Sequence, residues 1–167
     1  MVIGLLSDTH GYLDEKIFDF FSGCDEIWHA GDIGNAEVLR TLTDFKPLVA
    51  VFGNIDGSDV RIETSKHQRL IRGELEIWMT HIGGYPGNYD RSIRDAISLN
   101  PPDLFISGHS HILKIIRDKK LGLLHINPGA AGFHGFHKVR TAVRFTILKK
   151  TIKNVEIIEL GPRSLAI

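Results

Sequence analysis

The sequence predicts an α/β fold in which two β-sheets pack face to face with helices on their outer sides. Early in the chain, short apolar runs alternate with stretches of helical periodicity, an order typical of parallel βαβ units. Later, the apolar runs come in close pairs across short turns, which predicts a second, largely antiparallel set of strands. With 167 residues, 43% of them hydrophobic, we expect a single domain over 1–167 with a sizeable core.

The early part of the chain holds three predicted strands and two predicted helices. Apolar runs indicate strands at 2–6, 26–30 and 48–52. Apolar residues near helical spacing indicate helices at 13–21 and 36–42, and Gly23 is a stop signal after the first. The βαβαβ order predicts that these strands form the parallel half of a sheet.

The rest of the chain is predicted to be mainly β. Strands are expected at 69–72, 75–80, 103–107, 113–117 and 123–126, followed by a hairpin of 139–148 and 152–160. One amphipathic helix is expected at 89–98, closed by Asn100-Pro101-Pro102. A Gly- and His-rich segment at 130–138 precedes the final hairpin.

Composition restricts the partners and the compartment. Lys plus Arg equals Asp plus Glu, 20 each, so no global field gathers nucleic acid or an anionic membrane. No apolar run reaches the roughly 20 residues of a membrane span, and residues 1–7 suit a core strand better than a signal peptide. Cys24 is the only cysteine and is expected to be buried rather than nucleophilic. We therefore expect a cytoplasmic protein without a membrane partner.

Side chains that can bind metals follow several of the predicted strands directly. They are Asp8, His10, Asp32, Asn54, Asp56, His81, His109 and His111. In open α/β sheets, binding sites gather at the carboxyl ends of strands. Local alternatives exist, since Asp8 also suits a helix N-cap and Asn54 with Asp56 suits an Asx turn. His29, inside a strand, is expected to be packed and hydrogen-bonded, and His67 to lie on the surface.

Without Asp56, the set contains seven oxygen and nitrogen ligands and no thiolate. Such a set suits Mn, Fe, Ni, Co or Zn and disfavours a structural zinc site. Seven ligands are too many for one catalytic ion with an open position, but they fit two ions that share a carboxylate. Two divalent ions would keep a positive charge beside two aspartates and one hydroxide, and this charge would attract a phosphate oxygen. Metal binding also lowers the pKa of water from about 15.7 toward about 7.

In chain order the motifs resemble those of the calcineurin-like metallophosphoesterases, and the short chain is similar to their small bacterial and archaeal phosphodiesterase branch. The motifs are Asp8-x-His10, Gly31-Asp32, Gly53-Asn54-x-Asp56, His81 and Gly108-His109-x-His111. The resemblance implies a four-layer fold of two mixed β-sheets flanked by helices. It implies one metal on Asp8, His10, Asp32 and His111, and another on Asp32, Asn54, His81 and His109, with Asp32 bridging. Manganese is the metal we expect first.

The resemblance further implies a hydrolase, most of all a phosphodiesterase, in which a metal-bound hydroxide attacks phosphorus in line without a phosphoenzyme. Asp32, Asn54, Asp56 and His81 are the expected catalytic residues, with Asp56 orienting a ligand. One position departs from the family pattern, because Ile55 stands where most members have a histidine. Isoleucine cannot protonate a leaving oxygen, so substrates with good leaving groups should be favoured.

The segment after Asn127-Pro128-Gly129 is the candidate for substrate contact. His134, His137 and Arg140 could meet a phosphate or a leaving group, and His137 could replace the missing acid. The alternative is that these histidines lie on the surface and that Lys138 and Arg140 form a solvated strand edge.

Two other functions compete with hydrolysis of a small phosphate ester. The same small branch resembles a eukaryotic retromer subunit that docks partners, so a non-catalytic binding scaffold is one alternative. A nuclease is the other, although the sequence lacks the basic and aromatic stripe that extended strands require. The resemblance also implies that the chain can form a homo-oligomer, a dimer or larger.

Overall fold

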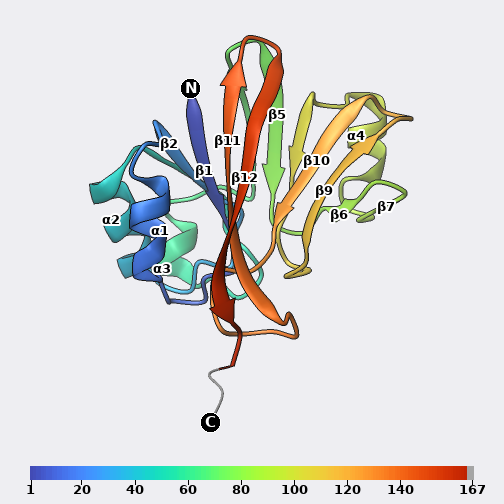
Figure 1. Cartoon of the computed structure of the whole chain (residues 1–167). Coiled ribbons are helices and arrows are strands. Elements are labelled where there is room, and N and C mark those ends of the chain that lie inside the picture. The colour runs from blue at the N-terminus through green and yellow to red at the C-terminus, as the bar shows by residue number, and fades with distance from the viewer. Residues whose placement is uncertain (165–167) are drawn as a thin grey trace.

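Two five-stranded sheets face each other in the computed structural model, which describes residues 1–164 (Figure 1). Helices lie on the outer side of each sheet, which makes four layers. The predicted fold class is therefore confirmed.

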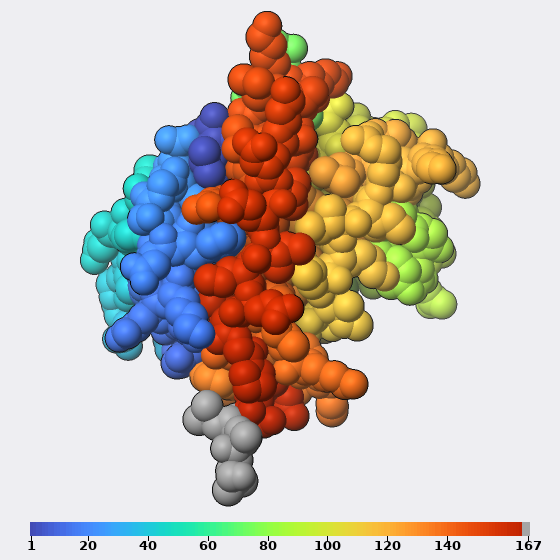
Figure 2. All heavy atoms as spheres, in the orientation of Figure 1, coloured from blue at the N-terminus to red at the C-terminus, as the bar shows by residue number. Residues whose placement is uncertain are grey.

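The first sheet contains strands from both ends of the chain. Its order is β12 (Thr151–Pro162), β11 (Val139–Leu148), β1 (Val2–Leu6), β2 (Glu26–His29) and β3 (Leu48–Ala50). Strands β1 to β3 are parallel, while β11 runs antiparallel to β1 and to β12. The C-terminal hairpin thus extends the first sheet, and Figure 2 shows it as a ridge between the N-terminal and central parts of the chain.

The second sheet is mixed, which corrects the expectation of a largely antiparallel set. Its order is β4 (His67–Arg72), β5 (Leu75–Thr80), β8 (Leu104–Ile106), β10 (Leu123–Pro128) and β9 (Leu113–Asp118). Strands β5, β8 and β10 are parallel, and only the edge strands β4 and β9 are antiparallel to their neighbours. Short hairpin turns are visible in the sequence, whereas the crossovers that make neighbours parallel are a tertiary feature.

Three helices cover the first sheet: α1 (Glu15–Phe21), α2 (Ala36–Phe45) and α3 (Ser58–Arg61) (Figure 1). The second sheet is covered by α4 (Arg94–Leu99) together with β6 (Gly84–Tyr85) and β7 (Asn88–Tyr89). The cap of α1 is Asp14, which accepts the N–H of Lys16, and not Asp8. Helix α4 begins later than predicted, because the Asp90 carboxylate accepts the N–H and O–H of Ser92 and holds a turn there. Helix α3 and the β6–β7 hairpin were not predicted.

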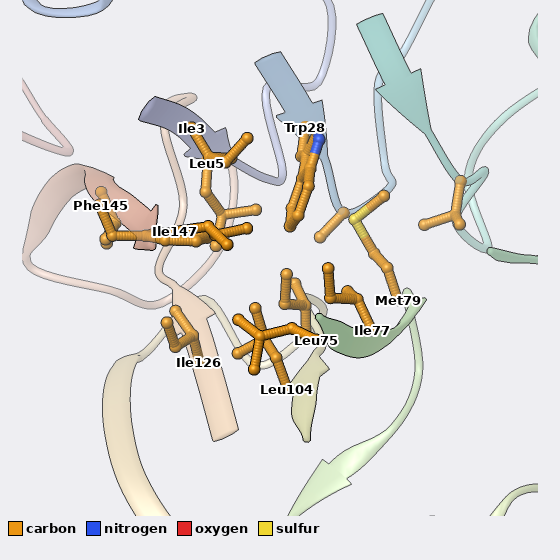
Figure 3. Packing of buried hydrophobic residues seen from close by; sticks show 14 residues of the cluster. Ile3, Leu5, Trp28, Leu75, Ile77, Met79, Leu104, Ile126, Phe145 and Ile147 are labelled. Atoms are coloured by element: carbon orange, nitrogen blue, oxygen red, sulfur yellow. The ribbon is translucent and has the colours of Figure 1, made fainter. Parts of the chain in front are cut away.

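A hydrophobic core fills the space between the two sheets (Figure 3). Trp28 and Phe145 of the first sheet face Ile77, Met79 and Leu104 of the second, and all five are buried. Aromatic and branched side chains on two facing sheets bury much apolar area, so this interface holds the sheets in a defined relation. No helix in residues 1–164 is both long and apolar enough to cross a membrane.

Candidate metal centre

Loops that follow strands of both sheets meet at one end of the molecule. The N–H of Asp8 donates to the carbonyl of Gly31 (2.9 Å), which joins the loops after β1 and β2. The N–H of Gly108 donates to the carbonyl of His81 (3.0 Å), which joins the loops after β8 and β5. The two sheets are linked by the N–H of His109, which donates to Asp8 Oδ2 (3.2 Å). The loops therefore form one site between the sheets.

The candidate ligands fall into two groups that share one residue. The groups are Asp8, His10, Asp32 and His111, and Asp32, His81 and His109, with the ligand atoms of each group within 4.8 Å of one another. Asp32 Oδ1 lies 3.2 Å from His81 Nε2, and Asp32 Oδ2 lies 3.8 Å from His10 Nε2. Its two oxygens thus face different groups, an arrangement that suits a carboxylate shared by two ions.

Several buried polar atoms at the centre lack a hydrogen-bond partner among the described residues. They include Asp8 Oδ1, His10 Nε2 and His81 Nε2. Leaving such atoms unsatisfied costs free energy unless a ligand binds them. His81 Nδ1 donates to the carbonyl of Ala30 (2.8 Å), so its hydrogen is on Nδ1 and the lone pair of Nε2 faces the cluster. These atoms fit divalent cations.

The backbone at the centre adopts an unfavourable conformation. Positive φ angles occur at Asp8 (55°), His10 (49°), Asp32 (53°), His109 (66°) and His111 (58°). Among the other non-glycine residues described, only Lys149 and Asn154 have positive φ angles, and both lie in the C-terminal hairpin. Each such residue costs roughly 1–2 kcal/mol. Strain of this kind persists where the surroundings impose it and is concentrated at functional sites.

The histidines differ in proton affinity because of their surroundings. Burial lowers the pKa of His10. Burial also acts on His81, but the Asp32 carboxylate, 3.2 Å from its Nε2, and the charge of Asp8 outweigh that effect and raise its pKa. Against its own burial, the pKa of His111 is raised by Asp8, whose Oδ1 lies 3.0 Å from His111 Nε2. The paired aspartates therefore favour a positive charge in the cluster, which divalent ions would supply.

Asp56 holds two of the loops together. Its buried carboxylate accepts three backbone N–H groups, from Ile33 (3.1 Å), Gly34 (2.7 Å) and Gly53 (2.7 Å). These bonds tie the loop that carries Asp32 to the loop that carries Asn54. Asp56 thus holds the two ligand-bearing loops through their backbone, and its expected role in orienting a ligand stays a prediction.

Asn54 and Ile55 lie at the open side of the centre. Both are exposed, and the N–H of Ile55 donates to Asp32 Oδ1 (3.1 Å). A Cβ on Gly53 would clash with Asp32, so the loop needs glycine there to approach the shared carboxylate. Asn54 thus follows a backbone segment in direct contact with the centre.

Two of the three predicted substrate-contact residues lie beside the centre. The ring of His134 is exposed and 5.2 Å from that of His10, and the ring of His137 is buried and 5.3 Å from that of His111. His137 Nε2 donates to the carbonyl of Gly132 (3.1 Å), which occupies its proton. This geometry disfavours His137 as the replacement acid and leaves His134 facing the opening.

Arg140 is buried within the fold, which corrects the expectation of a solvated strand edge and disfavours contact with a substrate. Its guanidinium is buried, lies 3.0 Å from Asp14 Oδ2 and stacks over the ring of Phe133 at 4.1 Å. It also donates to the carbonyls of Ala131, Leu160 and Pro162. With its donors engaged in this way, Arg140 is poorly placed to bind a phosphate at the centre.

The predictions for His29, His67 and Cys24 are confirmed. His29 is buried, donates through Nε2 to Thr9 Oγ1 (2.9 Å) and accepts the N–H of Gly31 (3.2 Å), and burial lowers its pKa to about 4. His67 is exposed. Burial raises the pKa of the Cys24 thiol to about 11, so it is not a nucleophile.

Two residues that support the candidate metal centre could not be found from the sequence, Ala30 and Arg61. The carbonyl of Ala30 orients His81, and Arg61 donates to the carbonyls of Asp56 (2.6 Å) and Gly53 (3.1 Å). Neither has a signal in the sequence, because the first acts through its backbone and the second is one of several exposed arginines.

Comparison with known proteins supports this description. The family described as calcineurin-like phosphoesterase superfamily domain matches residues 1–150. A probable metallophosphoesterase of Methanocaldococcus jannaschii is 37% identical over 142 residues, which cover 78% of this chain and 68% of that protein.

Solved structures show the same fold. An archaeal phosphodiesterase has a TM-score of 0.70 at 23% identity and covers 95% of this chain and 100% of its own. The zinc complex of Vps29 from Entamoeba histolytica has a TM-score of 0.72 at 16% identity and covers 96% and 100%.

Proposed function

The chain belongs to the calcineurin-like phosphoesterase superfamily, a family of hydrolases, and we propose that it is a two-metal phosphodiesterase that acts on a small phosphate ester. The observation that carries this proposal is Asp32, whose two oxygens face the two candidate ligand groups. Two divalent ions bound there would supply a hydroxide at neutral pH for in-line attack and positive charge for the transition state.

The side chains have distinct roles in this proposal. Asp8, His10, Asp32 and His111 would hold one ion, and Asp32, Asn54, His81 and His109 the other. Ala30 keeps the lone pair of His81 Nε2 directed at the cluster. Ile55 offers no proton to a leaving group, so the preferred substrates should have leaving groups that need none. His134 is the side chain best placed to contact the phosphate or its substituents.

The metal and the compartment are further proposals. A centre of imidazole, carboxylate and amide groups suits manganese, with Ni, Fe, Zn or Co as alternatives, and zinc is bound in the Vps29 structure. A cytoplasmic location agrees with a single buried cysteine.

The alternative is a non-catalytic protein-binding scaffold of the same fold. A scaffold has no need to keep metal-binding side chains in a strained backbone conformation. All seven candidate ligands are present, and five of them have positive φ angles. We therefore favour the hydrolase, and an assay separates the two functions.

The first experiment tests hydrolysis and metal binding together. Metal-stripped protein is incubated with Mn, Ni, Fe or Zn, its metal content is measured, and it is assayed with bis(p-nitrophenyl) phosphate and p-nitrophenyl phosphate. We expect two ions per chain, a raised melting temperature, and faster hydrolysis of the diester. His81→Ala should abolish hydrolysis, while His67→Ala, on the exposed face of β4, should leave it unchanged.

The outcomes distinguish the candidate functions. Faster hydrolysis of the monoester would make the protein a phosphatase with the same centre. Absence of hydrolysis with any metal, from protein that binds two ions, would contradict the proposal and favour the scaffold.

A further inference from the structure

The loop before β11 contains the tripeptide Gly-Phe-His twice in succession, at residues 132–137. The two copies have opposite environments. Phe133 of the first copy packs on the ring of Tyr12 at 4.7 Å, while Phe136 of the second copy is fully exposed, with a relative exposure of 103%. His137 is buried and follows directly. Anchors on both sides therefore hold Phe136 out into solvent.

Phe136 stands on the rim of a cavity whose floor is the candidate metal centre. The cavity has a volume of about 370 Å³, and its lining includes His10, Asp32, His109 and His111. Two other exposed apolar side chains share the rim, Ile112 (60% exposed) and Ile55 (47% exposed). The three come from separate loops, after β3, after β8 and before β11. Exposed apolar side chains that gather at one opening are typical of a binding site.

A second cavity beside the centre has a different character. It has a volume of about 410 Å³ and reaches Asn54 and His81. Its walls include the charged side chains of Arg61, Lys66 and Asp90. Phe52 and Ile82 also line this second cavity, but beside charged groups, whereas Ile55, Ile112 and Phe136 gather on the side of the centre where His10 and His111 lie.

We propose that Ile55, Ile112 and Phe136 bind an apolar alkyl or aryl ester group of the substrate. This inference rests on the proposed function, because a phosphate held at the floor places its substituent between the three side chains. Their side chains offer no hydrogen bond, so a polar substituent would lose water there without a replacement. An apolar substituent would instead remove its own surface and that of the rim from water. The rim therefore selects phosphoesters with an apolar group.

Phosphonates test the inference without depending on turnover. They share a phosphate-like head and differ only in one substituent, so the difference in affinity between them reports the contact of that substituent with the rim. Binding of methylphosphonate, hexylphosphonate and phenylphosphonate to manganese-saturated protein is measured by titration calorimetry. We expect the hexyl and phenyl compounds to bind about tenfold more tightly than the methyl compound, which corresponds to burial of roughly 55 Å² of apolar surface.

Variants assign this preference to the rim. In Phe136→Ala the advantage of the hexyl and phenyl compounds should fall to about threefold or less, with methylphosphonate affinity unchanged, because about half of the contact area would be lost. Phe136→Leu should keep most of it. Leu99→Ala is the matched control, since Leu99 is also strongly exposed (89%) but lies at the end of α4.

The results separate this inference from the function on which it rests. Equal affinities of the three phosphonates for the wild-type protein would overturn the apolar rim and leave the phosphoesterase intact. An unchanged preference in Phe136→Ala would also overturn it. If manganese-saturated protein bound none of the phosphonates, the proposed function itself would fail.

Discussion

Oδ1 of Asp32 lies 3.2 Å from Nε2 of His81, while its other carboxylate oxygen faces His10 at 3.8 Å. One side chain therefore joins the two candidate ligand groups. Asp32 is buried, and the nearby His81 ring and the hydrogen bond from the N–H of Ile55 lower its pKa although burial opposes this. It stays ionised, as a carboxylate shared by two cations must.

Replacement of this carboxylate should affect both ions. In Asp32→Asn we expect hydrolysis to fall about 100-fold or more, because the amide cannot neutralise the charge of two cations. Metal analysis should find fewer than two ions per chain. Retention of both ions and of most activity would contradict the shared position.

Asp56→Asn should affect the fold more than the chemistry. Both oxygens of the carboxylate accept backbone N–H groups, three in all. In asparagine one of these oxygens becomes an NH₂ group, which cannot accept and would face an N–H donor. We expect a loss of about 2 kcal/mol in the free energy of unfolding and a smaller loss of activity than in Asp32→Asn. Urea denaturation and the diester assay measure the two effects. Equal losses of activity in both variants would show that the roles are wrongly assigned.

Arg140→Met tests whether Arg140 is structural. Removing one partner of a buried ion pair leaves Asp14 uncompensated, so we expect a loss of about 3 kcal/mol in the free energy of unfolding. The KM for the diester should not change. Lys138→Met, which alters an exposed neighbour, should be neutral in stability. A raised KM with wild-type stability would instead place Arg140 at the substrate.

His125 should make the fold sensitive to acid. It is buried in β10 with its ring 5.6 Å from that of Phe105, and burial, with the charge of Lys114, lowers its pKa to about 4. Above pH 6.5 the ring is neutral in both the folded and the unfolded chain, so stability is at its full value. As pH falls from about 6.5 to about 4, only the unfolded chain takes up the proton, and the free energy of unfolding drops by about 1.4 kcal/mol per pH unit.

The variant His125→Phe isolates this contribution. His29 has a similar pKa and stays in both proteins, so its effect cancels in the comparison. Between pH 6.5 and 4 the wild-type protein should lose about 3 kcal/mol more than the variant. Urea denaturation at several pH values measures the difference, and parallel pH profiles of the two proteins would contradict the burial of a neutral His125.

Most strands and the candidate ligands were predictable because both depend on local patterns. Apolar runs place β1, β2, β5 and β8, and ligand-type residues follow each of them directly. The late start of α4 was not predictable, because the apolar pattern continues through Tyr89 while the Asp90–Ser92 turn interrupts the helix. The structural contacts of Arg140 and Asp56 were not predictable, because their partners lie far away in the sequence or belong to the backbone.

The sequence by itself determined the fold class and the composition of the candidate metal centre, since periodicity and the side chains after each strand are local properties. Only the tertiary structure decided the parallel order of β5, β8 and β10, the division of the oxygens of Asp32 between two groups, and the gathering of Ile55, Ile112 and Phe136 at one opening. These depend on which loops meet in space, and that follows from the packing of one sheet on the other.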